Sequence, residues 1–218
     1  MHITEGALSG SPEGIAVLAV GMAAAAAGTA VGLGKMDYER VPQVAMLTAA
    51  FFVVSLVPVP LGPTSVHLVL IGLLGLILGW AAFPAVLVAL LLQLMMFGVG
   101  GGPTTLGINT LAMALPAVVC YYLFHRAVHA KSETATFLVG FAAGAVGVLL
   151  GATIVSAAIL ISAREFTVLA ASAWGIHFLI APVEGLVTGA SVVFLRKVRP
   201  ELLDAPLLVP RAAEIADV

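Results

Sequence analysis

The feature that most constrains this chain is a long central stretch without charge. From Val41 to His125 the sequence contains no Asp, Glu, Lys or Arg. Over the whole chain 61% of the residues are hydrophobic and 9% are charged, against roughly 25% charged in a typical soluble domain. We therefore predict an integral membrane protein. Its 218 residues allow one bundle of crossings of about 20 residues each, with no room for a separate soluble domain.

Seven apolar segments are predicted to cross or enter the membrane. Only helices can satisfy the backbone in lipid here, because the unbroken apolar runs lack the alternation of a transmembrane barrel. The segments are Gly14–Leu33, Pro42–Val59, His67–Trp80, Phe83–Phe97, Ile108–Phe124, Thr134–Ile161 and Val168–Leu195. The third and fourth are shorter than a usual span of about 20 residues, so they either borrow flanking residues or form a re-entrant hairpin. The predicted fold class is an all-α membrane protein, a bundle of about seven transmembrane helices.

The basic residues predict the orientation of this bundle. With seven crossings, eight of the nine Lys and Arg residues fall on the side that holds the C-terminus, and Arg164 falls on the other. Loops rich in Lys and Arg face the cytoplasm, so we predict the N-terminus outside the plasma membrane and the C-terminus inside. The chain is expected to be a single transmembrane domain over residues 1–218. It would comprise an external N-terminal segment and lid (1–13), the helix bundle (14–196) and a cytoplasmic tail (197–218).

The start of the chain carries the clearest chemical signal. Residues 1–13 contain no Lys or Arg and so lack the basic region of a signal peptide, and we expect Met1 to remain as the N-terminus. Its α-amine, the His2 amide nitrogen and the His2 imidazole can then close fused chelate rings around one cation. His67 follows a Gly-Pro-Thr-Ser turn on the same predicted face. Its imidazole would complete four nitrogens, a ligand set suited to Ni(II) or Cu(II); a chance Met-His start is the alternative.

Polar side chains inside the apolar segments are further candidates. His177 and Glu184 are seven residues apart, which places them on one helical face about two turns apart. Ionisable groups within a membrane usually face the bundle interior, where this pair would relay protons, orient ligands or form a structural hydrogen bond. Gln93 and Asn109 lie near the outer ends of their segments. We expect them either to hydrogen-bond across helices or to support the second ring nitrogen of His67.

The glycine patterns have structural interpretations. Gly98–Leu106 lacks the Gly-Lys-Ser/Thr ending of a nucleotide-binding loop, so a flexible connector is preferred over a loop that packs on the lid. Gly21, Ala25, Gly28 and Gly32 form a small-residue face, which allows close helix packing inside the bundle or against another subunit. No serine-hydrolase or zinc-peptidase motif occurs, so the chain is not expected to be an enzyme.

Five stretches of the sequence, taken in order, form a specific pattern. They are MHITEG, VPVPLGPTSVHL, FPAVLVALLLQLMMFG, GGGPTTLGINTLAMALPA and HFLIAPVEGLVTG. This pattern resembles the substrate-binding membrane subunit of group I energy-coupling-factor transporters for cobalt and nickel, the CbiM/NikM family. The resemblance covers nearly the whole chain and implies seven helices with an N-terminus that inserts toward the core.

The resemblance also implies a ligand set and partners. The ion would be bound by the Met1 amine, the amide nitrogen and imidazole of His2 and the imidazole of His67, with no ligand at His177. Co(II) or Ni(II) would be the transported substrate, without an organic cofactor. Thr4 occupies a position that is often Met or Pro in members of the family, and the segment before His67 differs from the cobalt-type pattern, which leaves the choice of metal open. Implied partners are a transmembrane coupling subunit (T component), ATPase subunits (A components) that hydrolyse ATP, and a small accessory membrane protein, with membrane lipid but no nucleic acid.

The predicted function is thus high-affinity capture and uptake of Co(II) or Ni(II). The alternative is a stand-alone proton-coupled secondary transporter of a small solute, with His177 and Glu184 as a proton relay. Such transporters commonly carry inverted repeats and broken helices. No convincing internal repeat is found, although Pro116 and Pro182 could interrupt helices. A purely structural scaffold would leave the two external histidines without a purpose.

Overall fold

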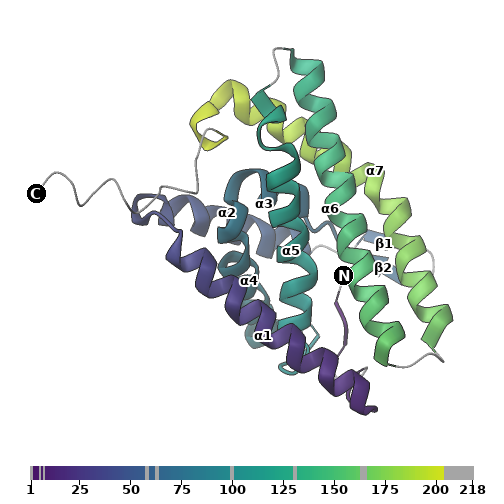
Figure 1. Cartoon of the computed structure of the whole chain (residues 1–218). Helices are drawn as coiled ribbons and strands as arrows, with labels where there is room; N and C mark the ends of the chain where they lie inside the picture. Colours follow the sequence, from purple (N-terminus) through teal and green to yellow (C-terminus); the bar gives the residue numbers. More distant parts are fainter. Residues whose placement is uncertain are drawn as a thin grey trace, which may run out of the picture.

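The order of helices follows the apolar segments. The structure is a computed structural model, and it describes residues 2–4, 6, 8–56, 59–61, 64–98, 101–129, 132–162 and 166–203. Its α-helices (Figure 1) are α1 (Pro12–Gly34), α2 (Val41–Ser55), α3 (Ile71–Leu78), α4 (Ala82–Phe97), α5 (Leu106–Phe124), α6 (Glu133–Ser162) and α7 (Thr167–Val198). Each predicted apolar segment overlaps one of these helices.

Five stretches of the described chain are helical, long and apolar enough to cross a membrane. They are α1, the combined stretch Ile71–Phe97 that holds α3 and α4, and the three helices α5, α6 and α7. The third and fourth predicted segments therefore belong to one apolar stretch, bent at the 3-10 turn η2 (Gly79–Ala81). Helix α2 has 15 residues, fewer than the roughly 20 of a usual span. These stretches make the chain a multi-pass membrane protein.

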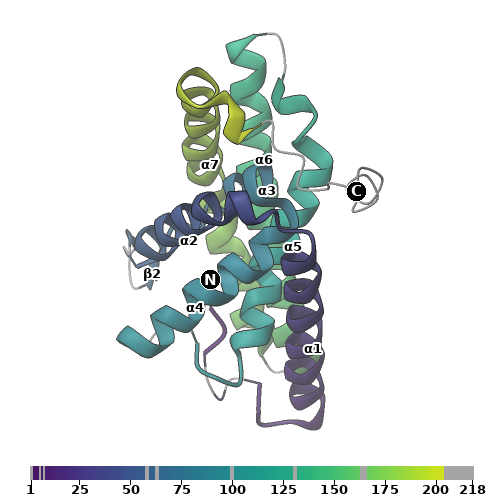
Figure 2. The ribbon, with the colours of Figure 1, turned by 90° about the vertical axis from the view of Figure 1, so that its left-hand side faces the viewer.

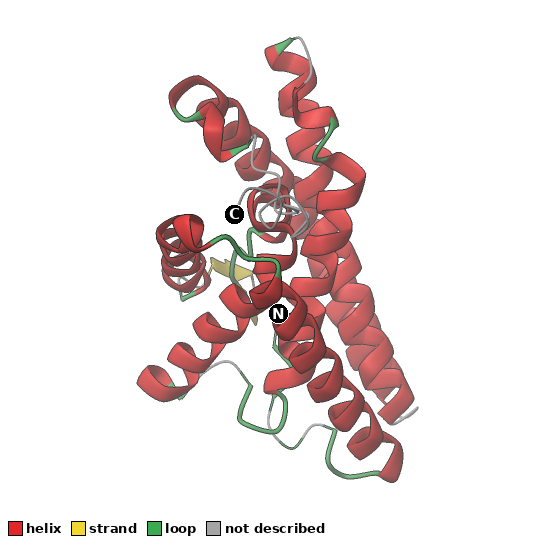
Figure 3. Cartoon of the chain, turned by 60° about the vertical axis from the view of Figure 1, so that its left-hand side comes forward, coloured by secondary structure: helices red, strands yellow, loops and turns green. Residues whose placement is uncertain are grey.

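A short β-hairpin separates α2 from α3. Its strands are β1 (Val59–Leu61) and β2 (Thr64–Val66), which pair antiparallel with Pro60 opposite Ser65; Figure 3 shows the hairpin in yellow among the helices. The helix predicted to reach Val59 ends at Ser55. Val59 itself precedes Pro60, and the residue before a proline disfavours the helical conformation. The fold is helical as predicted, but the helix expected from His67 begins only at Ile71.

Helix α3 is the centre of the core. All of its residues are buried, and two of its glycines bring it against neighbouring backbones. A Cβ at Gly72 would lie 2.5 Å from the carbonyl oxygen of Ala143 in α6, and one at Gly75 would lie 2.2 Å from that of Ala117 in α5. Small residues permit such close approach between membrane helices. The start of α3, and with it the chain that follows His67, is thereby fixed inside the protein (Figures 1 and 2).

Gly72→Ala is expected to lower the stability of the protein. Its methyl group would overlap the α6 backbone, which cannot move as a flexible side chain can, and overpacking of this kind costs about 1–3 kcal/mol. Gly175→Ala is the matched control, because a Cβ there has nothing within 4 Å and alanine favours a helix over glycine by about 1 kcal/mol. Thermal unfolding in detergent should show a lower midpoint for the first variant only. Equal midpoints would contradict the close α3–α6 contact.

The small-residue face of α1 packs inside the bundle. Gly21, Ala25, Gly28 and Gly32 are all buried. A Cβ at Gly21 would meet Ile108 of α5 at 2.8 Å, and one at Gly28 would meet the Phe83 ring of α4 at 2.4 Å. Internal packing, the preferred interpretation of this face, is confirmed.

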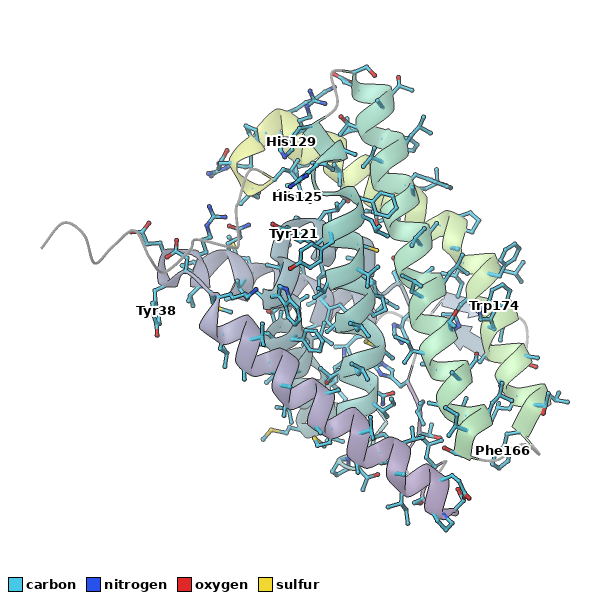
Figure 4. All side chains as sticks on the ribbon, in the orientation of Figure 1. Tyr38, Tyr121, His125, His129, Phe166 and Trp174 are labelled. Atoms are coloured by element: carbon cyan, nitrogen blue, oxygen red, sulfur yellow. The ribbon has the colours of Figure 1, made fainter. Side chains whose placement is uncertain are left out.

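One end of the bundle gathers basic residues. Lys35, just after α1, lies 5.5 Å from the Trp80 ring centre. Lys197, in the last turn of α7, forms an ion pair of 2.8 Å with Glu133 at the start of α6. The C-terminal end of α5 lies at this end of the bundle too, and there the rings of Tyr121 and His125 stack with centroids 4.6 Å apart (Figure 4).

The opposite end holds the start of α1. The hydroxyl of Ser11 caps α1 by accepting from the Gly14 N–H and donates to the carbonyl oxygen of Ser162 at 2.6 Å. Ser162 is the last residue of α6, whereas the Lys197–Glu133 pair lies at its first. A helix of this length is about 45 Å long at 1.5 Å per residue. The start of α1 and the basic residues of α7 therefore lie at opposite ends of one long helix.

Candidate functional site

His2 and His67 are both partly buried and lie beside one another. Their ring centroids are 5.0 Å apart and their planes differ by 25°. His2 belongs to the extended segment before α1, whereas His67 follows β2, so two distant parts of the sequence meet here. The Nδ1 atom of His2 is buried and has no hydrogen-bond partner within the described chain. Buried polar atoms are normally paired, which makes this nitrogen a candidate ligand atom.

Burial keeps both imidazoles neutral. It lowers the pKa of His67 to about 3 and the pKa of His2 well below its ordinary value of 6.5. Loss of water around a ring disfavours its charged form, and a charge on either ring would also repel the other. At physiological pH each ring is therefore in the neutral form, which is the form of histidine that binds metal ions.

Asn109 holds the segment that presents His2. Its side-chain oxygen accepts the Ile3 N–H at 2.8 Å, and its nitrogen donates to the Ile3 carbonyl oxygen at 3.0 Å. Asn109 is fully buried, near the start of α5. Because Ile3 directly follows His2, this double hydrogen bond fixes both the depth and the direction of the N-terminal segment (purple in Figure 1).

Gly101 packs directly on the same segment. A Cβ at this position would lie 2.2 Å from the Ile3 carbonyl oxygen and 2.4 Å from the Asn109 side-chain nitrogen. Its φ of +102° is also a conformation that glycine adopts readily and other residues rarely do. The preferred prediction of a flexible connector is wrong for this glycine, and the alternative of a loop packed on the N-terminal segment is correct. Residues 99–100 lie outside the described residues.

Glu184 holds the segment that follows His67. Its side chain is fully buried in α7 and accepts hydrogen bonds from the backbone N–H groups of Val69 and Leu70. Hydrogen bonds from two consecutive backbone N–H groups hold this part of the chain against α7. Of the roles considered for Glu184, a structural hydrogen bond is the one that the structure shows.

The remaining candidates have different surroundings. His177 Nδ1 lies 2.6 Å from the Ala173 carbonyl oxygen one turn earlier in α7. Gln93 of α4 donates to the Ser55 hydroxyl at the end of α2, which is a contact across helices. Met1, the other predicted ligand residue, lies outside the described residues.

Comparisons with known proteins agree with the sequence resemblance. The family model "Cobalt uptake substrate-specific transmembrane region", CbiM, matches residues 2–202. A putative metal transport protein of Haemophilus influenzae is 46% identical over 149 residues, which cover 68% of this chain and 69% of that protein. The fused nickel transport protein NikMN of Rhodobacter capsulatus is 33% identical over 98% of this chain and 67% of its own. The cobalt transport protein CbiM of Sorangium cellulosum is 31% identical, over 78% of this chain and 79% of its own.

A solved structure shares the fold. The crystal structure of a transition metal transporter superposes with a TM-score of 0.77 at 28% identity, and the match covers 91% of this chain and 93% of that one. Together with the family match over nearly the whole chain, this similarity settles the relationship. The chain belongs to the CbiM family of transmembrane transport components, which are not enzymes.

Proposed function

We propose that this chain captures Co(II) or Ni(II) with four nitrogen atoms. These are the Met1 α-amine, the His2 amide nitrogen, the His2 imidazole and the His67 imidazole. The observation that carries the proposal is the His2–His67 pair, with ring centroids 5.0 Å apart. Relatives named for cobalt and for nickel transport support the choice of ion. The ion is the transported substrate, and the site requires no organic cofactor.

The distance between the rings fits a shared ion. Imidazole nitrogens lie about 2.0–2.1 Å from a bound zinc ion, and a similar bond to Co(II) or Ni(II) puts each ring centre roughly 3 Å from the metal. Two rings on one ion can then have centres up to roughly 6 Å apart, and the observed separation of 5.0 Å is within this limit. Four nitrogens in one plane are a ligand set that Ni(II) accepts well.

The support from Asn109 favours the His2 amide as a ligand. Asn109 already accepts the N–H of Ile3, so the His2 amide is the backbone nitrogen left next to the His2 ring. Gly101 closes over the same segment. A ligand segment held in place before the ion arrives loses less conformational freedom on binding, which favours high affinity.

We further propose that the N-terminus faces outside and the C-terminus inside the plasma membrane. Ser11 joins the final residue of α6, whereas Lys197 pairs with its first residue. Basic residues favour the cytoplasmic side, which assigns the opposite end, where α1 begins, to the exterior. A bundle of seven helices in this orientation would meet ions arriving from outside, with residues 1–13 as ligand and lid and 197–218 as cytoplasmic tail.

The proposed role is that of the substrate-binding subunit of an energy-coupling-factor transporter. The sequence lacks the Gly-Lys-Ser/Thr ending of a nucleotide-binding loop, so the energy for uptake would come from partner ATPase (A component) subunits through a transmembrane coupling (T component) subunit. A small accessory membrane protein would complete the assembly. In this scheme ATP hydrolysis in the partners opens or reorients this subunit, and the ion is released inward.

The geometry offers less support for a proton-coupled transporter. Glu184 accepts from two backbone N–H groups, and the Nδ1 atom of His177 faces its own helix, so these contacts do not join the two side chains as a relay pair. Helices α5 and α7 also continue through Pro116 and Pro182, whereas secondary transporters commonly break helices at the substrate site.

Metal binding is expected to weaken steadily as the pH falls from about 8 to about 5. The pKa values of both imidazoles are lowered by burial. In this pH range protons therefore compete with the metal ion at the Met1 α-amine and the His2 amide nitrogen. The amide must lose its proton at any pH, and α-amines ordinarily titrate at about 7.7–8.0. Affinity should therefore fall about tenfold per pH unit above that range and about a hundredfold per unit below it.

Calorimetric titration of Ni(II) into the metal-free protein tests this proposal. Titrations in two buffers of different ionisation enthalpy count the protons released, and about two are expected at pH 6. An affinity that stays constant from pH 5 to pH 8 would exclude the proposed ligand set.

A further inference from the structure

The chain that carries His67 is attached to the bundle through one buried carboxylate. The Leu70 N–H lies 3.0 Å from Glu184 Oε2 and 3.3 Å from Oε1, and the Val69 N–H donates to Oε1 as well. Glu184 is fully buried. A buried carboxylate is costly unless hydrogen bonds compensate for the lost water, so these contacts bind the two segments to one another strongly.

The turn that Glu184 holds is strained. Leu70 has φ 52° and ψ 29°, and it is the one non-glycine residue with positive φ in the described part of the chain. A leucine in this left-handed region is unfavourable and persists only where the surroundings enforce it. The Glu184 hydrogen bonds fix the N–H groups of Leu70 and of the residue before it. This turn sets the angle between the His67 segment and α3.

The helix behind Glu184 is itself fixed. A Cβ at Gly144 of α6 would lie 2.5 Å from the Glu184 carbonyl oxygen, so α6 and α7 are in close backbone contact at this level. Helix α3 packs equally closely on α6 through Gly72. Glu184 therefore connects the turn at Leu70 to a rigid part of the bundle.

We propose that Glu184 is a positioning residue for the metal site, whose carboxylate holds the Val69–Leu70 turn and so places the His67 ring beside His2. The inference rests on the proposed function. Glu184 does not bind the ion in this scheme; it acts through His67. Any displacement of α7 relative to α5, which holds the His2 segment through Asn109, would change the separation of the two rings.

Glu184→Gln tests this role in the full-length purified protein. The amide keeps the shape of the side chain, but its NH2 group cannot accept from a backbone N–H, so one contact of the turn is lost. We expect Ni(II) affinity, measured by competition with a coloured chelator, to fall about 10- to 100-fold, as is typical when a partner that orients a ligand is removed. Thr188→Val is the matched control. Thr188 is one turn further along α7 and equally buried, and its hydroxyl has no partner among the described residues. The Ni(II) affinity of Thr188→Val should therefore match that of the unaltered protein.

A double variant separates positioning from a general loss of structure. If Glu184 acts through His67, then Glu184→Gln should weaken Ni(II) binding no further once His67→Ala is present, since effects of coupled residues do not add. The visible absorption spectrum of bound Ni(II) in Glu184→Gln should also shift toward that of His67→Ala. The proposal would be overturned if the Ni(II) affinity of the double variant fell by the product of the two single-variant losses. It would also be overturned if Glu184→Gln kept the affinity of the unaltered protein.

Two further measurements keep the test decisive. Should Glu184→Gln fail to fold, Glu184→Asp retains a carboxylate that is one methylene shorter, and an intermediate loss is expected; unchanged affinity in that variant would overturn the proposal. His67→Ala alone reports on the proposed function. Tight binding by His67→Ala would refute the metal site itself, whereas loss in His67→Ala with none in Glu184→Gln would refute only the role of Glu184.

Discussion

Adding one or two residues before Met1 is expected to abolish tight metal binding while leaving every side chain in place. Each added residue moves the free amine by up to about 3.3–3.6 Å along the chain, whereas a ligating nitrogen lies only about 2.0–2.1 Å from the metal. The amine would leave the chelate ring that it forms with the His2 amide. The loss should be the largest of any change tested, because the three nitrogens of the N-terminal chelate depend on that ring.

The control for this experiment is reversal. An extension ending in a protease site that leaves Met1 free should restore Ni(II) binding after cleavage, and the same residues added after Val218 should have no effect. Thermal unfolding of the metal-free protein should be similar for all forms, because Asn109 holds the N-terminal segment at Ile3. Unchanged Ni(II) affinity in the extended protein would show that the amine is not a ligand.

His67→Ala is expected to lower Ni(II) affinity by more than about 100-fold, the upper end of the effect of losing a supporting partner. The three N-terminal nitrogens would remain, so residual weak binding with an altered visible spectrum is expected. Because His67 is held in the fold by its neighbours along the chain through Glu184, its truncation should leave the rest of the bundle intact. Calorimetric titration and the Ni(II) absorption spectrum measure both consequences.

His177→Ala is the control for His67→Ala, because it shows whether the loss of Ni(II) affinity is specific to His67. His177 is also a partly buried histidine, and it lies close enough to His67 to interact with it electrostatically. Its Nδ1 faces the Ala173 carbonyl oxygen, and we expect this variant to keep most of the affinity. Equal losses in both variants would require a different site, with His177 as a ligand.

The helices were predictable because lipid imposes a simple local rule. A chain in a bilayer must satisfy its own backbone, so long apolar runs become helices, and the segment drawn as Thr134–Ile161 is observed as α6 (Glu133–Ser162). The rule is weakest where segments are short. It did not predict the hairpin of β1 and β2 or the left-handed Leu70 before α3, because inside a protein non-helical backbone can be satisfied by contacts distant in the sequence.

The supports of the site were less predictable than its ligands. Asn109 was a candidate partner of His67 or of another helix, and the structure shows it paired with the backbone of Ile3. Gly101 was expected in a flexible connector, although a run of consecutive glycines is also what close backbone contact requires. Gln93 pairs with Ser55, which is one of the two contacts expected of it. In each case the residue type indicated a buried hydrogen bond or close contact, but not its partner.

The sequence alone determined that the chain is a helical membrane protein and that His2 and His67 are the imidazoles to consider, because apolar runs and rare ionisable residues are local properties. The tertiary structure decided that the two rings meet and which groups hold them. Asn109 reaches Ile3 across 106 positions of the chain, and Glu184 reaches Leu70 across 114. Such contacts depend on how helices pack around α3, and the packing depends on glycine contacts between elements that no local pattern specifies.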